Sequence, residues 1–413
     1  MALKRNITFI LSEIREKIIF NDDDLNEVYT RIACLHLFDE VADFRQPGKI
    51  IYKLDDLLLL VFLVILEEGK QSFEYIADFI EVNYRRYEKL GLLCDGNCPS
   101  HDTLRRVFSL LDSDSLKEAT ICRFYEFLRQ LEDKSHSLKH IAIDGKFINA
   151  TGRQEGSKKP LGNLNVLNIY SVTENTCLIS EVVGEKTNEI PVAQQLLSSM
   201  NLKDCIVSGD ALHCQRKTCE IIRKQKGHYV LNAKDNQELL QEDIEAKFSD
   251  PRNSRKIKTI TGKDSKISVS VFRLPEGYDD EGFTGMASFV KMESERRNDR
   301  SICIRYFITD LIKAEDIYEV IRARWALENH HQIKDVYLHE DEFRCTDKKA
   351  ARNIAIMNNL IAQLLSIYIP LSGRIPRKAK IALRSDPVGQ MGLLLSLLDS
   401  KTIRDKMIKA SSK

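Results

Sequence analysis

The spacing of apolar residues changes once along the 413-residue chain, and this change limits the folds that the chain can adopt. Up to about residue 138, apolar residues recur at helical spacing. These segments are 7–20, 28–41, 54–66, 73–80 and 104–111. From His140 onward, short β-branched runs alternate with helical segments. We therefore predict an N-terminal helical domain, residues 1–138, followed by a mixed α/β domain, residues 139–370.

The second region has a recognisable order of elements. Strands are expected at 140–144, 165–172, 177–183, 205–208 and 228–233, and helices at 189–200, 215–226 and 236–248. Three successive strands followed by alternating helices and strands predict a mixed sheet with crossover helices. Alternating runs at about 251–311 predict a β-rich insertion. Further helices are expected at 314–338, 350–369 and 388–398, the last within a basic C-terminal tail, residues 371–413.

Composition excludes several classes of protein. With 43% hydrophobic and 30% charged residues, the chain has the profile of a globular protein. The longest apolar run, Leu57–Leu66, is about half as long as a bilayer-spanning helix, so no membrane partner is expected. The N-terminus carries no export signal, which predicts a cytoplasmic protein with free thiols. Cys94, Cys98 and His101 form only part of a zinc-binding pattern.

Charge is informative only in local segments, because the net charge is +1. Residues 251–270 contain six Lys or Arg against one Asp, and residues 371–413 contain ten against three. Such segments either contact phosphates or form solvated surface. Arg105 and Arg106 share one turn of a helix that Ser100 can cap. This N-terminal region could bind DNA ends, or it could be a plain helical bundle.

Two aspartates lie where predicted strands end. Asp144 ends the run HIAID and Asp210 follows the run CIVSG. Carboxylates at the ends of neighbouring strands converge, and they repel one another unless a cation lies between them. Mg²⁺ suits such a site, because it takes a few carboxylates and keeps water and phosphate as its other ligands. The alternative for each aspartate is an ordinary turn residue.

Glu328 is the third candidate carboxylate. Helical phase places it on the same stripe as Ile317 and Ile321, which predicts that it faces the sheet. Arg324 lies one turn before it, so the pair is either an ordinary i,i+4 ion pair or a metal ligand with its supporting arginine. Asp335 returns to the same stripe two turns later, so helical phase alone does not choose between the two carboxylates.

Five ordered motifs resemble those of bacterial insertion-sequence transposases of the H-repeat-associated type. They are DGK at 144–146, EKTNEIP at 185–191, GDALHCQ at 209–215, YVLNAKDNQ at 229–237 and RWALEN at 324–329. The resemblance covers about residues 45–360. It implies the DDE superfamily, whose catalytic domain is RNase H-like, and hence a magnesium-dependent enzyme that cuts and transfers DNA strands.

The resemblance also implies roles for individual residues. Asp144, Asp210 and Glu328 stand in the places of the three metal-binding carboxylates, with Asp144 bridging two Mg²⁺ or Mn²⁺ ions about 3.5–4 Å apart. Lys146 is a candidate phosphate contact, although a solvent-facing lysine is the alternative. Double-stranded DNA, both element ends and target, is the implied partner. A homodimer assembled on DNA and a location at the bacterial nucleoid are also implied.

The chain departs from one related signature. The Tyr-Arg-Glu-Lys pattern would place Tyr three residues before Arg324 and Lys seven residues after Glu328, but Ile321 and Asp335 occupy these positions, with Lys334 one residue short. Two other functions remain open at this point. One is a catalytically silent or domesticated copy that still binds DNA, and the other is a structure-specific nuclease on the same fold.

Overall fold

A computed structural model describes most of the chain between residues 37 and 382. The described ranges are 37–69, 72–89, 91–120, 139–149, 151–152, 162–173, 176–183, 188–261, 267–278, 282–295, 301–324, 332–372, 378–379 and 381–382. The chain forms two compact units. The helical unit comprises residues 1–135, 147–164 and 330–413, and the sheet unit comprises residues 136–146 and 165–329.

The helical unit is built on apolar helices with defined ends. They include α3 (Leu54–Glu68), α4 (Phe73–Val82), α5 (Tyr84–Lys89), α6 (His101–Leu110) and α13 (Lys348–Ser372). Nearly every residue of α3 is buried, and Gly69 ends this helix in the left-handed conformation, with φ of 74°. The predicted cap is confirmed, because Ser100 Oγ accepts a hydrogen bond from the Thr103 amide at 3.3 Å.

Helix α13 joins the helical unit from the far end of the chain. It packs against α3 and α6. The buried Asn353 side chain donates to the carbonyl oxygens of Phe108 at 2.8 Å and Leu111 at 3.1 Å. Segments more than two hundred residues apart in the sequence therefore share one core.

The sheet unit contains a single nine-stranded sheet. Its strands are β1 (Lys139–Ile148), β2 (Leu164–Ser171), β3 (Thr176–Val183), β4 (Cys205–Gly209), β5 (His228–Ala233), β6 (Ile257–Thr261), β7 (Ile267–Arg273), β8 (Ser288–Glu295) and β9 (Ile302–Thr309). The order is β3-β2-β1-β4-β5-β9-β8-β7-β6. Strands β1, β4 and β5 run parallel, whereas β2 and β3 pair antiparallel. This first half of the sheet is the RNase H-like mixed α/β fold that was expected.

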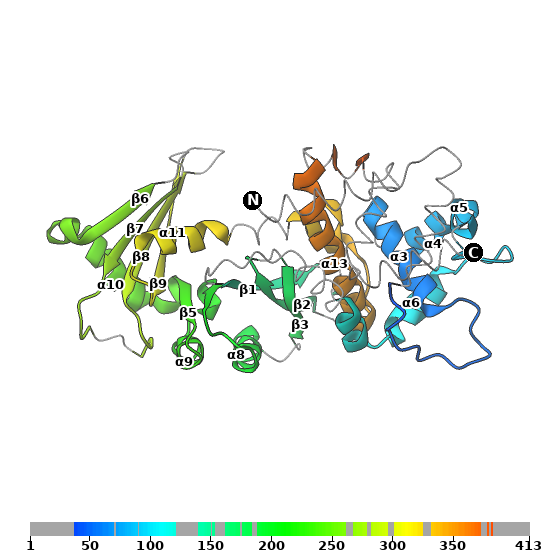
Figure 1. The fold of residues 1–413 in the computed structure, drawn as a ribbon, viewed down its shortest axis with the longest axis horizontal. Coiled ribbons are helices and arrows are strands. Elements are labelled where there is room, and N and C mark those ends of the chain that lie inside the picture. The colour runs from blue at the N-terminus through cyan, green and yellow to red at the C-terminus, as the bar shows by residue number, and fades with distance from the viewer. Residues whose placement is uncertain are drawn as a thin grey trace, which may run out of the picture. The chain divides into compact units, whose positions relative to one another are not determined.

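Helices cover both faces of this sheet. On one face lie α8 (Glu189–Ser199), α9 (Arg216–Lys224) and α10 (Glu238–Ser249), and their apolar side chains form one core with odd-numbered residues of β1 and β4, such as Ile143 and Val207. On the other face α11 (Ala314–Ala323) packs against β5, β6 and β7 (Figure 1). Neighbouring residues of β4, β5, β8 and β9 therefore serve two separate cores.

The β-rich segment does not form a separate sheet. Strand β9 pairs antiparallel with β5, with Leu231 opposite Ile308, and β8, β7 and β6 follow outward (Figure 1). The sequence pattern predicted strands in this segment but not this pairing, because pairing between strands about eighty residues apart leaves no local signal.

Four predicted helices need further comment. Of the helix expected at 28–41, residues 37–41 are described, and they form a turn, so that part of the prediction is wrong. The helices at 7–20 and 388–398 lie outside the described residues. Of the helix expected at 314–338, residues 314–323 form α11, residues 325–331 are not described, and Ile333–Tyr337 is π-helical rather than α-helical.

Within the described part of the chain, no helix is long and apolar enough to cross a membrane.

Candidate active site

The parallel pairing of three strands sets the position of the candidate site. Ile143 of β1 lies opposite Gly209 of β4, and Gly209 lies opposite Leu231 of β5. The next residue on each strand is polar: Asp144, Asp210 and Asn232. The register sets these three polar residues at one level, although β1 continues to Ile148, so the prediction that Asp144 ends its strand is wrong. Asp144 and Asp210 are therefore side by side on neighbouring strands, and the convergence of their carboxylates stays a prediction.

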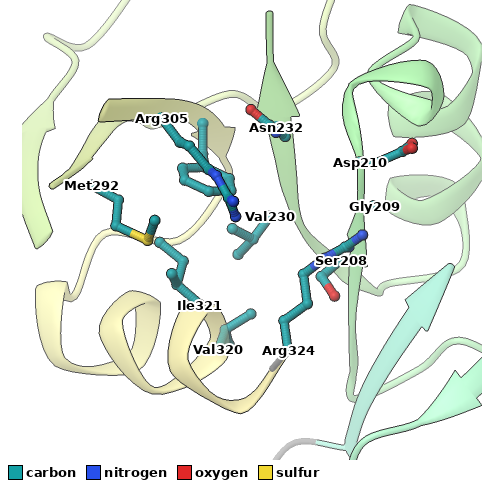
Figure 2. Close-up of a pocket in the computed structure, with 11 residues that line it drawn as sticks. Ser208, Gly209, Asp210, Val230, Asn232, Met292, Arg305, Val320, Ile321 and Arg324 are labelled. Atoms are coloured by element: carbon teal, nitrogen blue, oxygen red, sulfur yellow. The ribbon is translucent and has the colours of Figure 1, made fainter. Parts of the chain in front are cut away.

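Asp210 leaves the strand and begins a turn. Its Oδ1 accepts a hydrogen bond from the Leu212 amide at 3.1 Å and lies 4.0 Å from Nε2 of His213. The side chain is 46% exposed, so it retains oxygen atoms that solvent or a ligand can reach. Figure 2 shows the Asp210 carboxylate pointing away from the side chains of Arg305 and Arg324.

Asp144 has a cationic neighbour on the opposite side. Arg324, the residue that ends α11, places a guanidinium nitrogen 3.8 Å from Asp144 Oδ1. Both side chains are about one-fifth exposed. The sequence predicted Arg324 as a partner of Glu328 on its own helix. Its ion pair with Asp144 joins the end of α11 to the middle of β1, a contact that local spacing does not reveal.

A cavity of about 190 Å³ lies beside the strand ends. Asp210, Asn232, Arg305 and Arg324 supply charged and polar groups to its wall. Its apolar lining comes from β5, β8, β9 and α11: Val230, Met292, Phe307, Val320 and Ile321. Figure 2 shows Arg324 extending from the end of α11 toward Ser208 and Gly209. A wall of apolar side chains with a few charged and polar groups is an ordinary lining for a ligand site.

Two buried histidines flank the aspartates. His140 Nε2 is 2.8 Å from Ser208 Oγ, and burial, aided by the charge of Arg324, lowers the pKa of His140 to about 4. His213 is fully buried, and neither of its ring nitrogens has a hydrogen-bond partner among the described residues. Burial lowers the pKa of His213, whereas the carboxylates of Asp210 and Glu189 act in the opposite direction. Both rings are therefore neutral near pH 7.

The donor atoms at this edge fit a hard divalent cation. Carboxylate oxygens of Asp144 and Asp210 are the ligands that Mg²⁺ and Mn²⁺ prefer. In the described part of the chain, no three His, Cys, Asp or Glu side chains already form a metal site. Glu328, the third expected ligand, lies outside the described residues. The structure thus pairs Asp144 with Arg324, sets Asp210 level with Asp144 on the neighbouring strand, and leaves the position of Glu328 undescribed.

The other candidate residues lie elsewhere. Lys146 is buried, so the alternative of a solvent-facing lysine is wrong. Arg105 and Arg106 are exposed on α6 of the helical unit. Arg105 pairs with Glu74 at 2.8 Å and with Asp102 at 3.5 Å.

Sequence reasoning missed two residues at this edge. Glu189 and His213 lie within motifs that carried the family resemblance, but no chemical role was assigned to them. The sequence did contain a signal for Glu189. Gly145 directly follows Asp144 and has no side chain, and Glu189 begins the next helix, so a carboxylate could pack against that glycine. For His213 the sequence offered no comparable signal beyond its place in the turn after Asp210.

Comparisons with known proteins place the chain among transposases. A family model described as "Transposase DDE domain" matches residues 135–365, and a second, "DDE_Tnp_1-associated", matches residues 35–122. The chain is 28% identical to "Putative transposase YncI" of Escherichia coli O157:H7 over 394 residues, which is 91% of this chain and 97% of that protein. It is 26% identical to "H repeat-associated putative transposase YhhI" of Escherichia coli K12, covering 79% of this chain and 88% of that protein.

One solved structure is similar at a lower level. It is a piggyBac transposase synaptic complex with hairpin DNA, with 12% identity and a TM-score of 0.44, covering 92% of this chain and 82% of that chain.

Proposed function

The chain belongs to the transposase DDE-domain family, and from this premise we propose that it binds the ends of its own element and catalyses metal-dependent DNA strand cleavage and strand transfer. The observation that carries the proposal is the register of the parallel strands, which sets Asp144 and Asp210 at one level. Two carboxylates at one sheet edge suit a divalent cation, and a transposase needs such a cation to work on phosphodiesters.

We assign the metal ligands to Asp144, Asp210 and Glu328. When bound, two Mg²⁺ or Mn²⁺ ions would activate the attacking oxygen and stabilise the leaving one. Arg324 holds Asp144 in place, because its guanidinium lies 3.8 Å from that carboxylate. It also lines the cavity, where it could contact a DNA phosphate.

We further propose that different regions of the chain carry out catalysis and DNA recognition. Residues 139–370 carry catalysis, and residues 1–138 carry recognition of the DNA ends, with Arg106 as an exposed candidate contact on α6. The basic residues of 371–413 would add phosphate contacts. Because two element ends are joined in one event, the active form would be a dimer assembled on DNA, at the nucleoid.

The test uses linear DNA carrying the element ends, with Mg²⁺, and measures end binding, cleavage and strand transfer separately. Asp144→Asn and Asp210→Asn should each lose cleavage by several orders of magnitude and retain end binding. Asp204→Asn is the matched control, because Asp204 lies just before the other end of β4 and is exposed. Cleavage within tenfold of wild type in either active-site variant would refute the metal assignment.

The same assay separates the alternatives. Wild-type protein that binds the ends without cutting them would be a silent copy, and protein that cuts without strand transfer would be a nuclease.

A further inference from the structure

Glu189 is a carboxylate at the candidate site to which the proposed mechanism gives no role. It is the first residue of α8 and lies against Gly145, the residue that follows Asp144 in β1. A Cβ atom at position 145 would come within 3.0 Å of all three atoms of the Glu189 carboxyl group. Real Cβ atoms essentially never approach other atoms so closely. Glycine at position 145 therefore leaves the space beside β1 that this carboxylate occupies.

Other contacts hold Glu189 at this place. Asn165 on β2 donates from Nδ2 to Glu189 Oε1 at 2.9 Å. Asn188 caps the helix by accepting from the Ile190 amide at 3.2 Å. The start of a helix also favours a negative charge, because its free amide groups point outward there. The side chain is thus directed at the strand rather than left in solvent.

Glu189 and Asp210 approach the same buried ring. Helix α8 packs against the turn of residues 211–213 that follows Asp210. His213 in this turn has no exposed surface and no hydrogen-bond partner for either ring nitrogen among the described residues, and its Nε2 faces Asp210 Oδ1 at 4.0 Å. The charges of Glu189 and Asp210 both act on this ring. A fully buried polar side chain without a partner beside two carboxylates indicates a site built for a further group.

We propose that Glu189 is a further carboxylate of the metal site, in addition to Asp144 and Asp210. The proposal rests on the function proposed above. Asp144 and Gly145 are neighbours on β1, so their side-chain positions face opposite sides of the sheet. Glu189 approaches β1 from the side of α8 and occupies the space that Gly145 leaves open. Metal binding would draw its carboxylate from Asn165 toward the Asp144 and Asp210 pair.

The test measures Mn²⁺ affinity of the full chain without DNA, by electron paramagnetic resonance of the free ion. Glu189→Gln should weaken Mn²⁺ binding at least tenfold, as should Asp144→Asn. Glu238→Gln is the matched control, because Glu238 is the exposed first residue of α10, and it should bind Mn²⁺ within twofold of wild type. Melting temperatures in EDTA would identify variants that fail to fold.

The outcomes separate the two proposals. If wild type binds Mn²⁺, Asp144→Asn binds it weakly and Glu189→Gln binds it normally, then Glu189 is not a ligand and the proposed function stands. If Asp144→Asn binds as well as wild type, or wild type does not bind, the metal assignment itself fails and the inference fails with it.

A second pair of variants tests the role of Gly145. Gly145→Ala should weaken Mn²⁺ binding as Glu189→Gln does, because the added methyl group displaces the carboxylate. In a Glu189→Ala background, which has no carboxylate to displace, Gly145→Ala should change the affinity less than threefold. If Gly145→Ala and Glu189→Ala instead weaken Mn²⁺ binding independently, Gly145 acts on another group. That result would contradict the claim that Gly145 makes room for the Glu189 carboxylate.

Discussion

Replacement of Lys334 by Met should destabilise the helical unit, although this lysine lies near the position where a related transposase signature has a basic residue. Its side chain is 2% exposed, and Nζ lies 3.1 Å from Glu340 Oε2 and 2.9 Å from Asn359 Oδ1. Glu340 is equally buried, and its other oxygen accepts from Asn358 at 3.1 Å. Lys334 is therefore held inside the unit by groups that satisfy its charge.

The expected loss follows from the burial of both partners. Removing one member of a buried ion pair costs about 3–5 kcal/mol, because the other charge remains buried without compensation. A tenfold change in an equilibrium corresponds to about 1.36 kcal/mol. Amide protection in α13, which packs against the Ile333–Tyr337 turn, should therefore fall by about a hundredfold to a few thousandfold.

Hydrogen exchange followed by mass spectrometry measures this loss directly. The double variant Lys334→Met with Glu340→Leu is the control, because replacing both charges by apolar groups should restore most of the protection. One result would refute the reasoning: Lys334→Met leaves the protection of α13 unchanged and instead flattens the dependence of log affinity for DNA on log salt by about 0.9. Lys334 would then be a phosphate contact.

Three further predictions address other parts of the molecule. Arg255 and Lys256 are exposed in the basic segment. If they contact phosphates, changing both to Gln should reduce the slope of log affinity for DNA against log salt by about 1.8. An unchanged slope would mean that they are ordinary solvent-exposed residues. His140 has a folded pKa of about 4, below its ordinary value of 6.5, so the unfolded chain takes up a proton first as the pH falls. Stability should therefore drop by about 2 kcal/mol between pH 6.5 and 5, and His140→Gln should remove that part of the drop in a pH series of melting curves. Glu328→Gln should lose cleavage by several orders of magnitude and Asp335→Asn tenfold or less, and the reverse result would mean that the resemblance was aligned to the wrong carboxylate.

The sequence predicted the elements of the sheet that have a local signal. Asp144 and Asp210 each follow an apolar run, so both could be identified before the register of β1 and β4 was known, although only Asp210 lies at the end of its strand. The family resemblance then ordered these strands into one fold. Helix ends with a cap, such as that at Ser100, were predicted for the same reason.

Contacts between distant segments could not be predicted in this way. The Arg324 to Asp144 pair, the approach of Glu189 to Gly145 and the burial of Lys146 depend on how helices cross strands far away in sequence. Residue type and helical phase do not specify such crossings. The sequence placed Arg324 beside Glu328 because helical spacing identifies only neighbours one turn apart on the same helix.

The pairing of β9 with β5 predicts the effect of deleting the segment that contains β6 to β9. A shortened protein that joins residue 250 to residue 312 would lack β6 to β9 and would leave β5 as an outer strand. The backbone amides and carbonyls of Val230 to Ala233, now paired with Tyr306 to Thr309, would then be open to other chains. An unprotected apolar edge recruits further strands, so the truncated protein should self-associate. The inserted strands thus cover the edge of β5 that would otherwise be open.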